Sequence, residues 1–333
     1  MIFDPTLLAI LVIGLALIFD FTNGFHDSAN SIATVVATGT LTPRQAVLMA
    51  AVCNFAAMWL FNLTVAATVG KGIVQPSAVD LYVIAGALGG AITWNLITWR
   101  LGLPTSSSHA LIGALIGATM MRQGTAPLLW DGISRTLIFI VASPCLGFAL
   151  GAVFNTIVRN LLPTHTPRQQ KFFRGAQIVS AALYSLGHGA NDAQKTAGII
   201  WLVLIAMGWS DVSMAIPLWC VWCSFGAMGL GTLAGGWRIV QTLGFKLTKL
   251  DNRGGFVAEM GGSMMLFAAT SLGIPVSTTH TITGSILGVG ASQSNPSVKW
   301  KKAQEITVAW VLTIPAAGFL AAACESMMRG FFS

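Results

Sequence analysis

Long apolar segments follow one another along almost the whole chain, and this pattern constrains the fold more than any other feature. Each is about 17–27 residues long and uninterrupted by alternating polar residues, which indicates membrane-spanning helices rather than the short strands of a membrane barrel. Only 9% of the 333 residues are charged, against about 25% in soluble domains. The chain is therefore expected to be an all-α polytopic membrane protein. This excludes a soluble enzyme, a nucleic-acid-binding domain and a disordered protein.

Two motifs each occur twice in the chain with nearly constant spacing. Gly24–Ser31 (GFHDSANS) returns 165 residues later as Gly189–Thr196 (GANDAQKT), and Pro104–His109 (PTSSSH) returns 171 residues later as Pro275–His280 (PVSTTH). Further positions return at the second spacing: Gly113, Gly117, Pro144 and Gly147 match Gly284, Gly288, Pro315 and Gly318. Such matches in one order indicate a duplicated unit.

The duplication predicts two membrane repeats, at 1–160 and 174–333, joined by a short basic cytoplasmic linker at 161–173. Each half contains five hydrophobic units, and an odd number of passes places the halves in opposite orientations, as an inverted-topology repeat. With the N-terminus outside, thirteen Lys and Arg residues fall in inner loops and four in outer loops. This bias agrees with the rule that cytoplasmic loops are rich in Lys and Arg.

The number of membrane segments depends on how two kinds of unit are built. The first unit of each half contains a polar motif, and we expect the helix to be interrupted there, at Asn23–Ser31 and Gly187–Thr196. The units that begin at Pro104 and Pro275 either cross the membrane or form re-entrant hairpins with a Pro-Ser/Thr-His tip. These possibilities give about 10–12 membrane segments.

Asp27 and Asp192 occupy equivalent positions of the two halves, inside apolar segments. A carboxylate at the bilayer centre costs about 2.5–3.5 kcal/mol even on lenient scales, so a functional role is favoured over a helix cap. Both copies also carry further polar residues nearby: Asn23, His26 and Asn30 in the first half, and His188, Asn191 and Lys195 in the second.

The second pair of motifs is typical of an anion site. A proline favours the first turn of a helix, and the residues after it present free backbone N–H groups and hydroxyls at the positive end of the helix dipole. The polar residues in question are Thr105, Ser106, Ser107 and Ser108 in one copy, and Ser277, Thr278 and Thr279 in the other. Two such ends could surround a tetrahedral oxyanion. His109 and His280 follow them, and either fix the tips as buried histidines or exchange a proton with the site.

An anion near two carboxylates requires a compensating cation. At about 6 Å and an effective dielectric near 20, each pair of like unit charges costs roughly 3 kcal/mol. Lys195 offsets part of this repulsion. A proton, Na⁺ or a divalent metal is therefore expected to accompany the anion, which favours cation-coupled symport over an uncoupled channel.

At these residues the chain resembles the PiT family of inorganic phosphate transporters, which carries one signature motif and one Pro-Ser/Thr-His tip in each half. The resemblance implies secondary active import of phosphate by alternating access, without an organic cofactor. It places phosphate between the tips, on their hydroxyls with Asn30 and Lys195. It places the coupling cation near Asp27 and Asp192. The other residues expected to take part are His26, Asn191, Asn23, His188, His109 and His280. Glu259 is a second candidate, with an interfacial acid near Arg253 as the alternative, and Asn54 is a weaker one.

His26 stands where Na⁺-coupled members of the family carry Asn, and the Phe-His-Asp version resembles the bacterial low-affinity branch. This favours H⁺ over Na⁺ and a bacterial cytoplasmic membrane as the location. It leaves open whether phosphate travels as a metal–phosphate complex and whether the chain forms a homodimer. A sulfate symporter is the alternative transporter, and an integral-membrane phosphatase the alternative enzyme. Ser134-Arg135 lacks the downstream histidine that such a phosphatase needs, so no enzyme activity is expected.

Overall fold

The computed structural model describes residues 4–162 and 166–332, in which twelve α-helices and two short 3₁₀ turns account for the regular structure. The helices are α1 (Pro5–Ala37), α2 (Pro43–Ala56), α3 (Thr64–Lys71), α4 (Leu81–Leu101), α5 (Ser107–Gln123), α6 (Trp130–Leu161), α7 (Pro167–Ala206), α8 (Leu218–Ala234), α9 (Trp237–Phe245), α10 (Asn252–Ser271), α11 (Thr278–Ala291) and α12 (Trp300–Phe332), with 3₁₀ turns at Ala57–Trp59 and Pro76–Ala78. The expectation of an all-α multi-pass membrane protein is confirmed.

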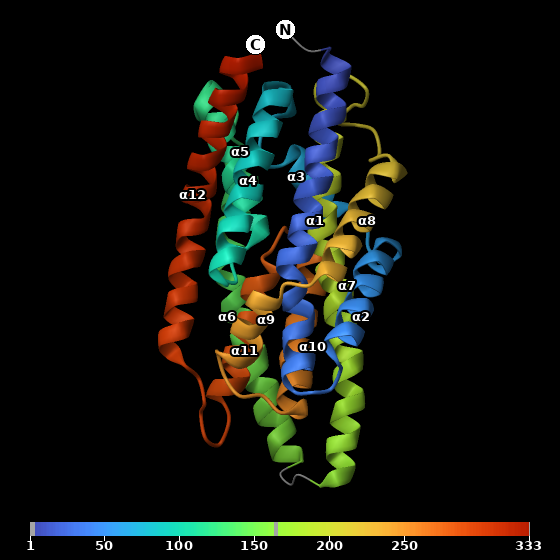
Figure 1. Ribbon diagram of the computed structural model, residues 1–333, viewed down its shortest axis with the longest axis vertical. Coiled ribbons are helices and arrows are strands. Elements are labelled where there is room, and N and C mark those ends of the chain that lie inside the picture. Colours follow the sequence, from blue (N-terminus) through green and yellow to red (C-terminus); the bar gives the residue numbers. More distant parts are fainter. Residues whose placement is uncertain (1–3, 163–165, 333) are drawn as a thin grey trace.

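The two halves run in opposite directions (Figure 1). The first helix of one half, α1, descends from the end of the molecule that holds both termini, whereas its counterpart α7 ascends towards that end. The last helices, α6 and α12, are opposed in the same way, and the pairs α4–α5 and α10–α11 enter from opposite ends. The predicted inverted topology is therefore confirmed.

The Pro104 and Pro275 units form the second arms of two re-entrant hairpins, α4–α5 and α10–α11. Their tips meet in the interior, where the Ser108 hydroxyl donates to the Val276 carbonyl oxygen at 3.1 Å. Because the hairpins enter from opposite ends and meet tip to tip, each returns to the end from which it entered instead of crossing. By length and composition alone, four of the described helices (α1, α4, α6 and α12) are long and apolar enough to span a membrane, or six if the bent pairs α2–α3 and α8–α9 each count as one span. Of these, α4 is an arm of the first hairpin.

The expected interruption at Asn23–Ser31 and Gly187–Thr196 is wrong, because α1 and α7 continue through both motifs without a break. Neither motif contains proline, and their polar side chains find partners on other helices instead of competing for their own backbone. The interrupted helices are the next units, where α2–α3 bends by 82° and α8–α9 by 72°.

Residues of the two signature motifs form hydrogen bonds with the backbone at the breaks between α2 and α3 and between α8 and α9. Gln194 of α7 accepts hydrogen bonds from the backbone amides of Val65 and Ala66 at the start of α3, at 3.1 and 3.3 Å. Ser28 of α1 accepts one from the Gly236 amide, beside the start of α9, at 2.6 Å. Each signature motif thus satisfies backbone amides that the break in a nearby helix leaves without intrahelical partners.

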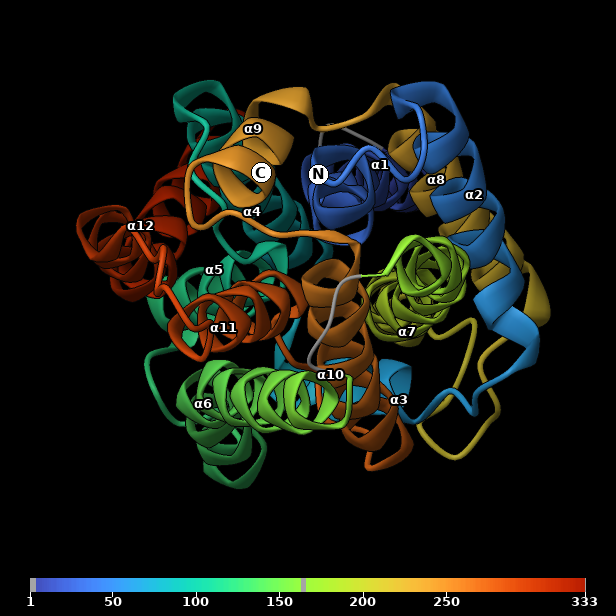
Figure 2. The ribbon, with the colours of Figure 1, turned by 90° about the horizontal axis from the view of Figure 1, so that it is seen from below.

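The two repeats interlock, as the view along the molecule shows (Figure 2). Helix α1 packs along α8 of the other half, and α7 along α2; α12 lies on the hairpin α4–α5, and α6 on α11. The signature glycines permit two of these approaches: a Cβ on Gly24 would lie 2.2 Å from the Met228 carbonyl oxygen, and one on Gly189 would lie 2.4 Å from that of Asn54.

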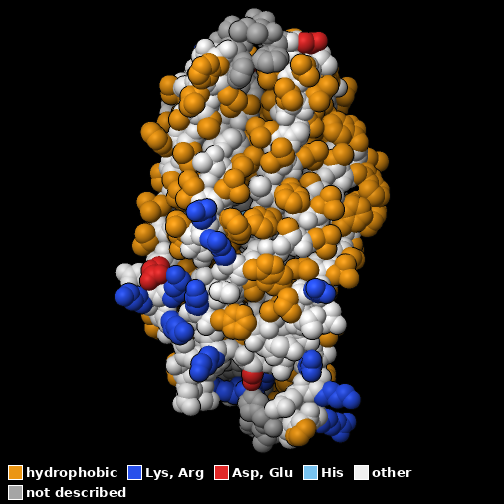
Figure 3. Space-filling view, in the orientation of Figure 1, with side chains coloured by type: hydrophobic (Ala, Val, Ile, Leu, Met, Phe, Trp, Pro, Cys, Tyr) orange, Lys and Arg blue, Asp and Glu red, His pale blue; other side chains and the backbone are white. Residues whose placement is uncertain are grey.

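The linker expected at 161–173 is largely helical, since α6 extends to Leu161 and α7 begins at Pro167; residues 163–165 lie outside the described residues. Figure 3 shows Lys and Arg side chains gathered over the lower part of this face, towards the end where α6 and α7 meet, whereas hydrophobic side chains dominate the upper part. This distribution agrees with a cytoplasmic lower end. The division at 1–160 and 174–333 stays a prediction.

Glycines also allow the hairpin helix α5 to lie against α12. A Cβ on Gly117 would meet the Gly318 carbonyl oxygen at 2.2 Å. We expect Gly117→Ala to destabilise the protein by about 1–3 kcal/mol, the usual cost of overpacking, measured as a lower thermal unfolding temperature in detergent. The matched control is Gly226→Ala on α8, where an added Cβ has no neighbour within 4 Å. Equal stability of the two variants would contradict the tight contact.

Candidate functional site

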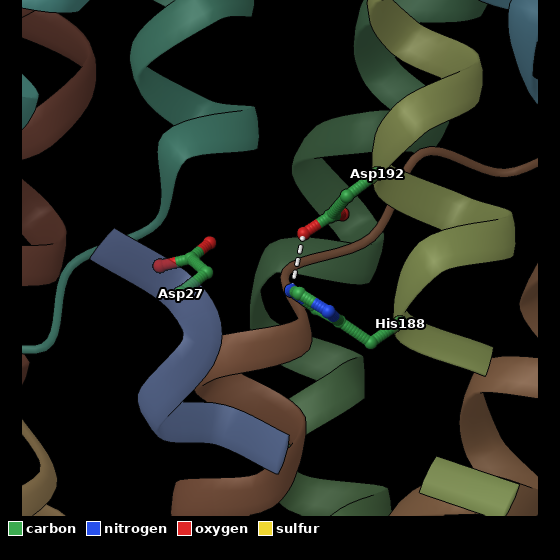
Figure 4. A group of neighbouring side chains, drawn as sticks. All are labelled: Asp27, His188 and Asp192. Atoms are coloured by element: carbon green, nitrogen blue, oxygen red, sulfur yellow. Dashed lines mark ion pairs between the residues drawn. The ribbon is translucent and has the colours of Figure 1, made fainter. Parts of the chain in front are cut away.

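Asp27 and Asp192 face one another from the middle of α1 and α7 (Figure 4). Their carboxylates are buried, with 2% and 0% of each residue exposed. With His188, they present one ligand atom each, all within 4.8 Å of one another, a grouping that could hold a small cation. The two residues that the repeat predicts to be equivalent are thus brought together by the inverted packing.

The first hydroxyl of each tip helix binds the carboxylate of its own half. Ser107, the first residue of α5, donates to Asp27 Oδ2 at 2.7 Å. Thr278, the first residue of α11, donates to Asp192 Oδ2 at 3.1 Å. These two contacts are equivalent under the duplication, so the central site has approximate twofold symmetry.

The second hydroxyl of each tip helix reaches the other half. Ser108 of the first tip contacts the Lys195 ammonium, which donates to it. Thr279 of the second tip accepts from the Asn30 amide at 2.9 Å and lies 3.4 Å from Asp27 Oδ1. Hydroxyls from both tips, an amide and an ammonium therefore converge on one place.

Lys195 breaks the symmetry of the site. It occupies the position that corresponds to Asn30, and it donates to Asp192 Oδ1 and, at 3.0 Å, to the Val276 carbonyl oxygen. Its side chain is 2% exposed, so its charge is shielded from water and balanced by the carboxylate. The only buried ammonium among the described residues thus lies between the two tips.

His26 and Asp27 form a close pair that is linked through Thr98 to α4 and the first tip. The Thr98 hydroxyl donates to the Trp94 carbonyl oxygen at 3.0 Å and accepts from Thr105, which leaves it a second acceptor position towards His26 Nε2, 3.3 Å away. The other nitrogen, Nδ1, lies 2.5 Å from Asp27 Oδ1, so the imidazole connects Thr98 to the carboxylate.

A comparable chain of hydrogen bonds ends at His188. Thr232 donates to the Met228 carbonyl oxygen and accepts from the Asn54 amide, which orients the Asn54 oxygen towards His188 Nδ1 at 3.1 Å. His188 Nδ1 is therefore protonated, while Nε2 lies 3.2 Å from Asp192 Oδ2. His188 thus lies between the Asn54 amide and the Asp192 carboxylate.

Two predicted asparagines connect α1 and α7 to the tips. The Asn23 oxygen accepts from Ser107 at 2.5 Å. The Asn191 amide donates to the Ile274 carbonyl oxygen at 3.1 Å, and its oxygen accepts from the Val276 amide at 3.2 Å. These contacts hold the hairpin tips against the long helices.

Ser106 and Ser277 have a different position from the other tip residues. Their hydroxyls accept from the backbone amides of His109 and His280, at 3.2 and 3.1 Å, so each is the N-cap of its own helix. Thr105 reaches the site only through Thr98, to which it donates.

The tip histidines lie apart from the carboxylates. The rings of His109 and His280 contact each other edge to face, with centroids 4.6 Å apart, and His280 stacks on Trp310 at 3.8 Å. Their nitrogens have no hydrogen-bond partner among the described residues. Their expected role in proton uptake stays a prediction.

Glu259 of α10 is fully buried one layer below the central site. It accepts hydrogen bonds from the hydroxyls of Thr34 on α1 and Ser180 on α7, and from the Gln177 amide at 3.4 Å. Gln177 in turn accepts from Thr40, at 2.6 Å, just after the end of α1. A buried polar path therefore extends from Glu259 towards the end of the molecule where Lys and Arg side chains gather (Figure 3).

Several residues of this polar interior were not predicted from the sequence. They are Asp20, Ser28, Thr34, Thr98, Gln177, Ser180, Gln194 and Thr232. Asp20 carried the same signal as Asp27, since it is an acidic residue inside an apolar segment. The hydroxyl and amide residues carried no signal, because Ser, Thr and Gln are ordinary packing residues in membrane helices.

A buried polar site at the meeting point of two inverted repeats and two re-entrant hairpins is typical of membrane transporters. A model described as the phosphate transporter family matches residues 23–321. The chain belongs to the phosphate transporter family. Members of this family are transporters, so the alternative of a membrane phosphatase is excluded.

Individual relatives match over nearly the full length. The chain is 52% identical to a probable low-affinity inorganic phosphate transporter of Rhizobium meliloti (strain 1021), over 96% of this chain and 97% of that protein. It is 43% identical to a protein of the same description from Bacillus subtilis (strain 168), over 98% of each. A solved structure described as the sodium-dependent phosphate transporter has a TM-score of 0.86 and 24% identity, covers 97% of this chain and 99% of its own, and shares the fold.

Proposed function

We propose that this protein imports inorganic phosphate together with protons across the bacterial cytoplasmic membrane. The observation that carries the proposal is the meeting of Ser107, Ser108, Thr278 and Thr279 with Lys195 between the two tips. Hydroxyl donors and one ammonium, shielded from water, match the acceptor-rich oxygens and negative charge of phosphate. The names of the relatives support phosphate as the substrate.

Coupling follows from the fact that the anion and the carboxylates need the same donors. In the closed site, Ser107 and Thr278 donate to Asp27 and Asp192. When these hydroxyls turn to phosphate, the carboxylates lose their donors in a medium of low dielectric. Each carboxylate then needs a cation, so phosphate binds together with the coupling ion.

The histidines favour H⁺ as that ion. His26 Nδ1 lies 2.5 Å from Asp27 Oδ1 and His188 Nε2 lies 3.2 Å from Asp192 Oδ2, so each carboxylate has an imidazole beside it that can take up a proton. A proton between nitrogen and oxygen neutralises the carboxylate without the oxygen ligands that Na⁺ requires. Glu259 and Gln177 provide a polar route for release to the cytoplasm.

Alternating access is the mechanism that fits this geometry. The site residues on α1, α7 and both tips are at most 2% exposed, so the arrangement is closed to both sides of the membrane. The hairpins enter from opposite sides and meet at the site, so withdrawal of one tip would open it to one side only. The homodimer stays a prediction, because the structure contains one chain.

The test is uptake of labelled phosphate into proteoliposomes under an imposed pH gradient or an imposed Na⁺ gradient. We expect an inwardly directed proton gradient to raise phosphate accumulation about 10-fold or more over no gradient, as a coupling energy of 1.4 kcal/mol would give, with no effect of Na⁺. Accumulation driven by Na⁺ alone would contradict proton coupling. Equal inhibition by sulfate and unlabelled phosphate would favour a general oxyanion carrier, and a strict requirement for added Mg²⁺ would favour transport as a metal–phosphate complex.

A further inference from the structure

Asp20 is a second buried carboxyl group of α1 that the phosphate site does not use. It lies seven residues before Asp27, two helical turns towards the outer end and on nearly the same face of the helix. It is 0% exposed, and neither of its carboxyl oxygens has a hydrogen-bond partner among the described residues.

The surroundings of Asp20 are polar but hold no cation beside it. Its polar neighbours are Thr196 of α7 and Asn23 of α1, and the Thr196 hydroxyl also has no partner among the described residues. The charged groups that act on Asp20 from further away are Asp192 and Lys195, both on α7 and already paired with each other. The described part of α8 has Cys220 and Cys223 as its only ionisable side chains, and that of α4 has Tyr82 and Arg100, near its two ends.

A carboxylate without a partner is very costly in a dry interior, whereas a carboxylic acid is tolerated. Asp20 therefore holds a proton in this closed state. The same group can release that proton when water reaches it, which happens when the outer side of the site opens.

Asp20 lies at the outer end of a row of three acidic groups. Two of them, Asp20 and Asp27, are on α1, and the third is Glu259 of α10, which α1 contacts. Asp27 lies two turns below it, and Thr34, which binds Glu259, lies two further turns below Asp27. Asn23 stands between the first two, and it contacts Ser107, which donates to Asp27. A polar path thus leads from Asp20 to the central carboxylates.

We propose that Asp20 is the outer proton-binding site of the transporter, which loads the coupling proton from outside and supplies it to Asp27 through water that enters the polar path past Asn23 and Ser107 when the outer side opens. This inference rests on the proposed phosphate–proton symport. Under this proposal the two acidic residues of α1 have different functions: Asp27 lies in the central site, and Asp20 supplies protons to that site.

The test compares wild-type protein with Asp20→Asn, Asp20→Glu and the exposed control Asp211→Asn in proteoliposomes. We expect Asp20→Asn to lower accumulation driven by a pH gradient about 10-fold or more, while exchange of internal for external labelled phosphate stays within about twofold of wild type. Asp20→Glu, which keeps a protonatable group, is expected to restore part of the accumulation.

A spectroscopic measurement tests the same group independently of transport. The infrared difference between wild type and Asp20→Asn at neutral pH is expected to contain the C=O stretch of a protonated carboxylic acid. Carboxylate bands alone, or normal proton-driven accumulation by Asp20→Asn, would overturn the proposal. Loss of phosphate exchange in both Asp20 variants would also overturn it, by assigning Asp20 to substrate binding or folding. Absence of exchange in wild type would instead contradict the proposed function, and the infrared band would still decide the protonation of Asp20.

Discussion

Replacement of Asp192 by asparagine is expected to reduce proton-driven phosphate uptake by about 100-fold or more. Asp192 pairs with Lys195 and His188 and accepts from Thr278. Removing one partner of a buried ion pair costs about 3–5 kcal/mol, because the other charge is left uncompensated. The measurement is initial uptake of labelled phosphate into proteoliposomes, normalised to the amount of folded protein.

The control for this experiment is Asp211→Asn, which removes an exposed carboxylate in the loop before α8 and should leave uptake unchanged. Asp27→Asn is the symmetry-related variant, and it should lose uptake to a similar degree because Asp27 receives the equivalent hydroxyl of Ser107. Phosphate accumulation near the wild-type level in either site variant would refute the assignment of these carboxylates to coupling.

Replacement of Lys195 by asparagine is the second change with a large expected effect. The duplication itself supplies the substitute, because Asn30 occupies the equivalent place in the other half. The variant loses the only buried ammonium described between the tips. We expect the half-saturating phosphate concentration to rise about 10- to 100-fold, as the loss of a charge-assisted contact of about 1.5–3 kcal/mol would give.

Lys302→Asn provides the matched control, since Lys302 forms an exposed pair with Glu305 on α12 and surface pairs contribute little. Both proteins should elute as single species from size-exclusion chromatography. An unchanged half-saturating concentration for Lys195→Asn would show that the anion does not bind between the tips.

Local sequence patterns predicted the components of the site but not all of their partners. Intramembrane carboxylates identified Asp27 and Asp192, and the repeated Pro-Ser/Thr-His tips identified their hydroxyl partners, because both signals depend on residue type and spacing alone. The same rule applied to Asp20 would have identified a third acid. Thr98 and Gln177 gave no such signal, since their importance depends entirely on which helix they face.

The position of the helix breaks was predicted wrongly for a physical reason. Glycine with Asn and Asp is common where helices end, so Asn23–Ser31 was expected to interrupt α1. In the folded chain Gly24 instead admits the backbone of α8, and the polar side chains bind residues on other helices. Because these side chains form hydrogen bonds with other helices, they do not compete for the backbone hydrogen bonds of α1, and the helix continues.

The sequence by itself determined the duplication, the opposite orientation of the two halves and the presence of paired carboxylates in the membrane. These follow from composition, spacing and loop charge, which require no knowledge of contacts. Only the tertiary structure decided that the tips exchange partners between halves, that Ser106 and Ser277 cap helices while their neighbours face the site, and that the motifs lie within continuous helices. Such contacts join residues as far apart as Asn30 and Thr279, and they exist only when the inverted repeats interlock and exclude water from the centre.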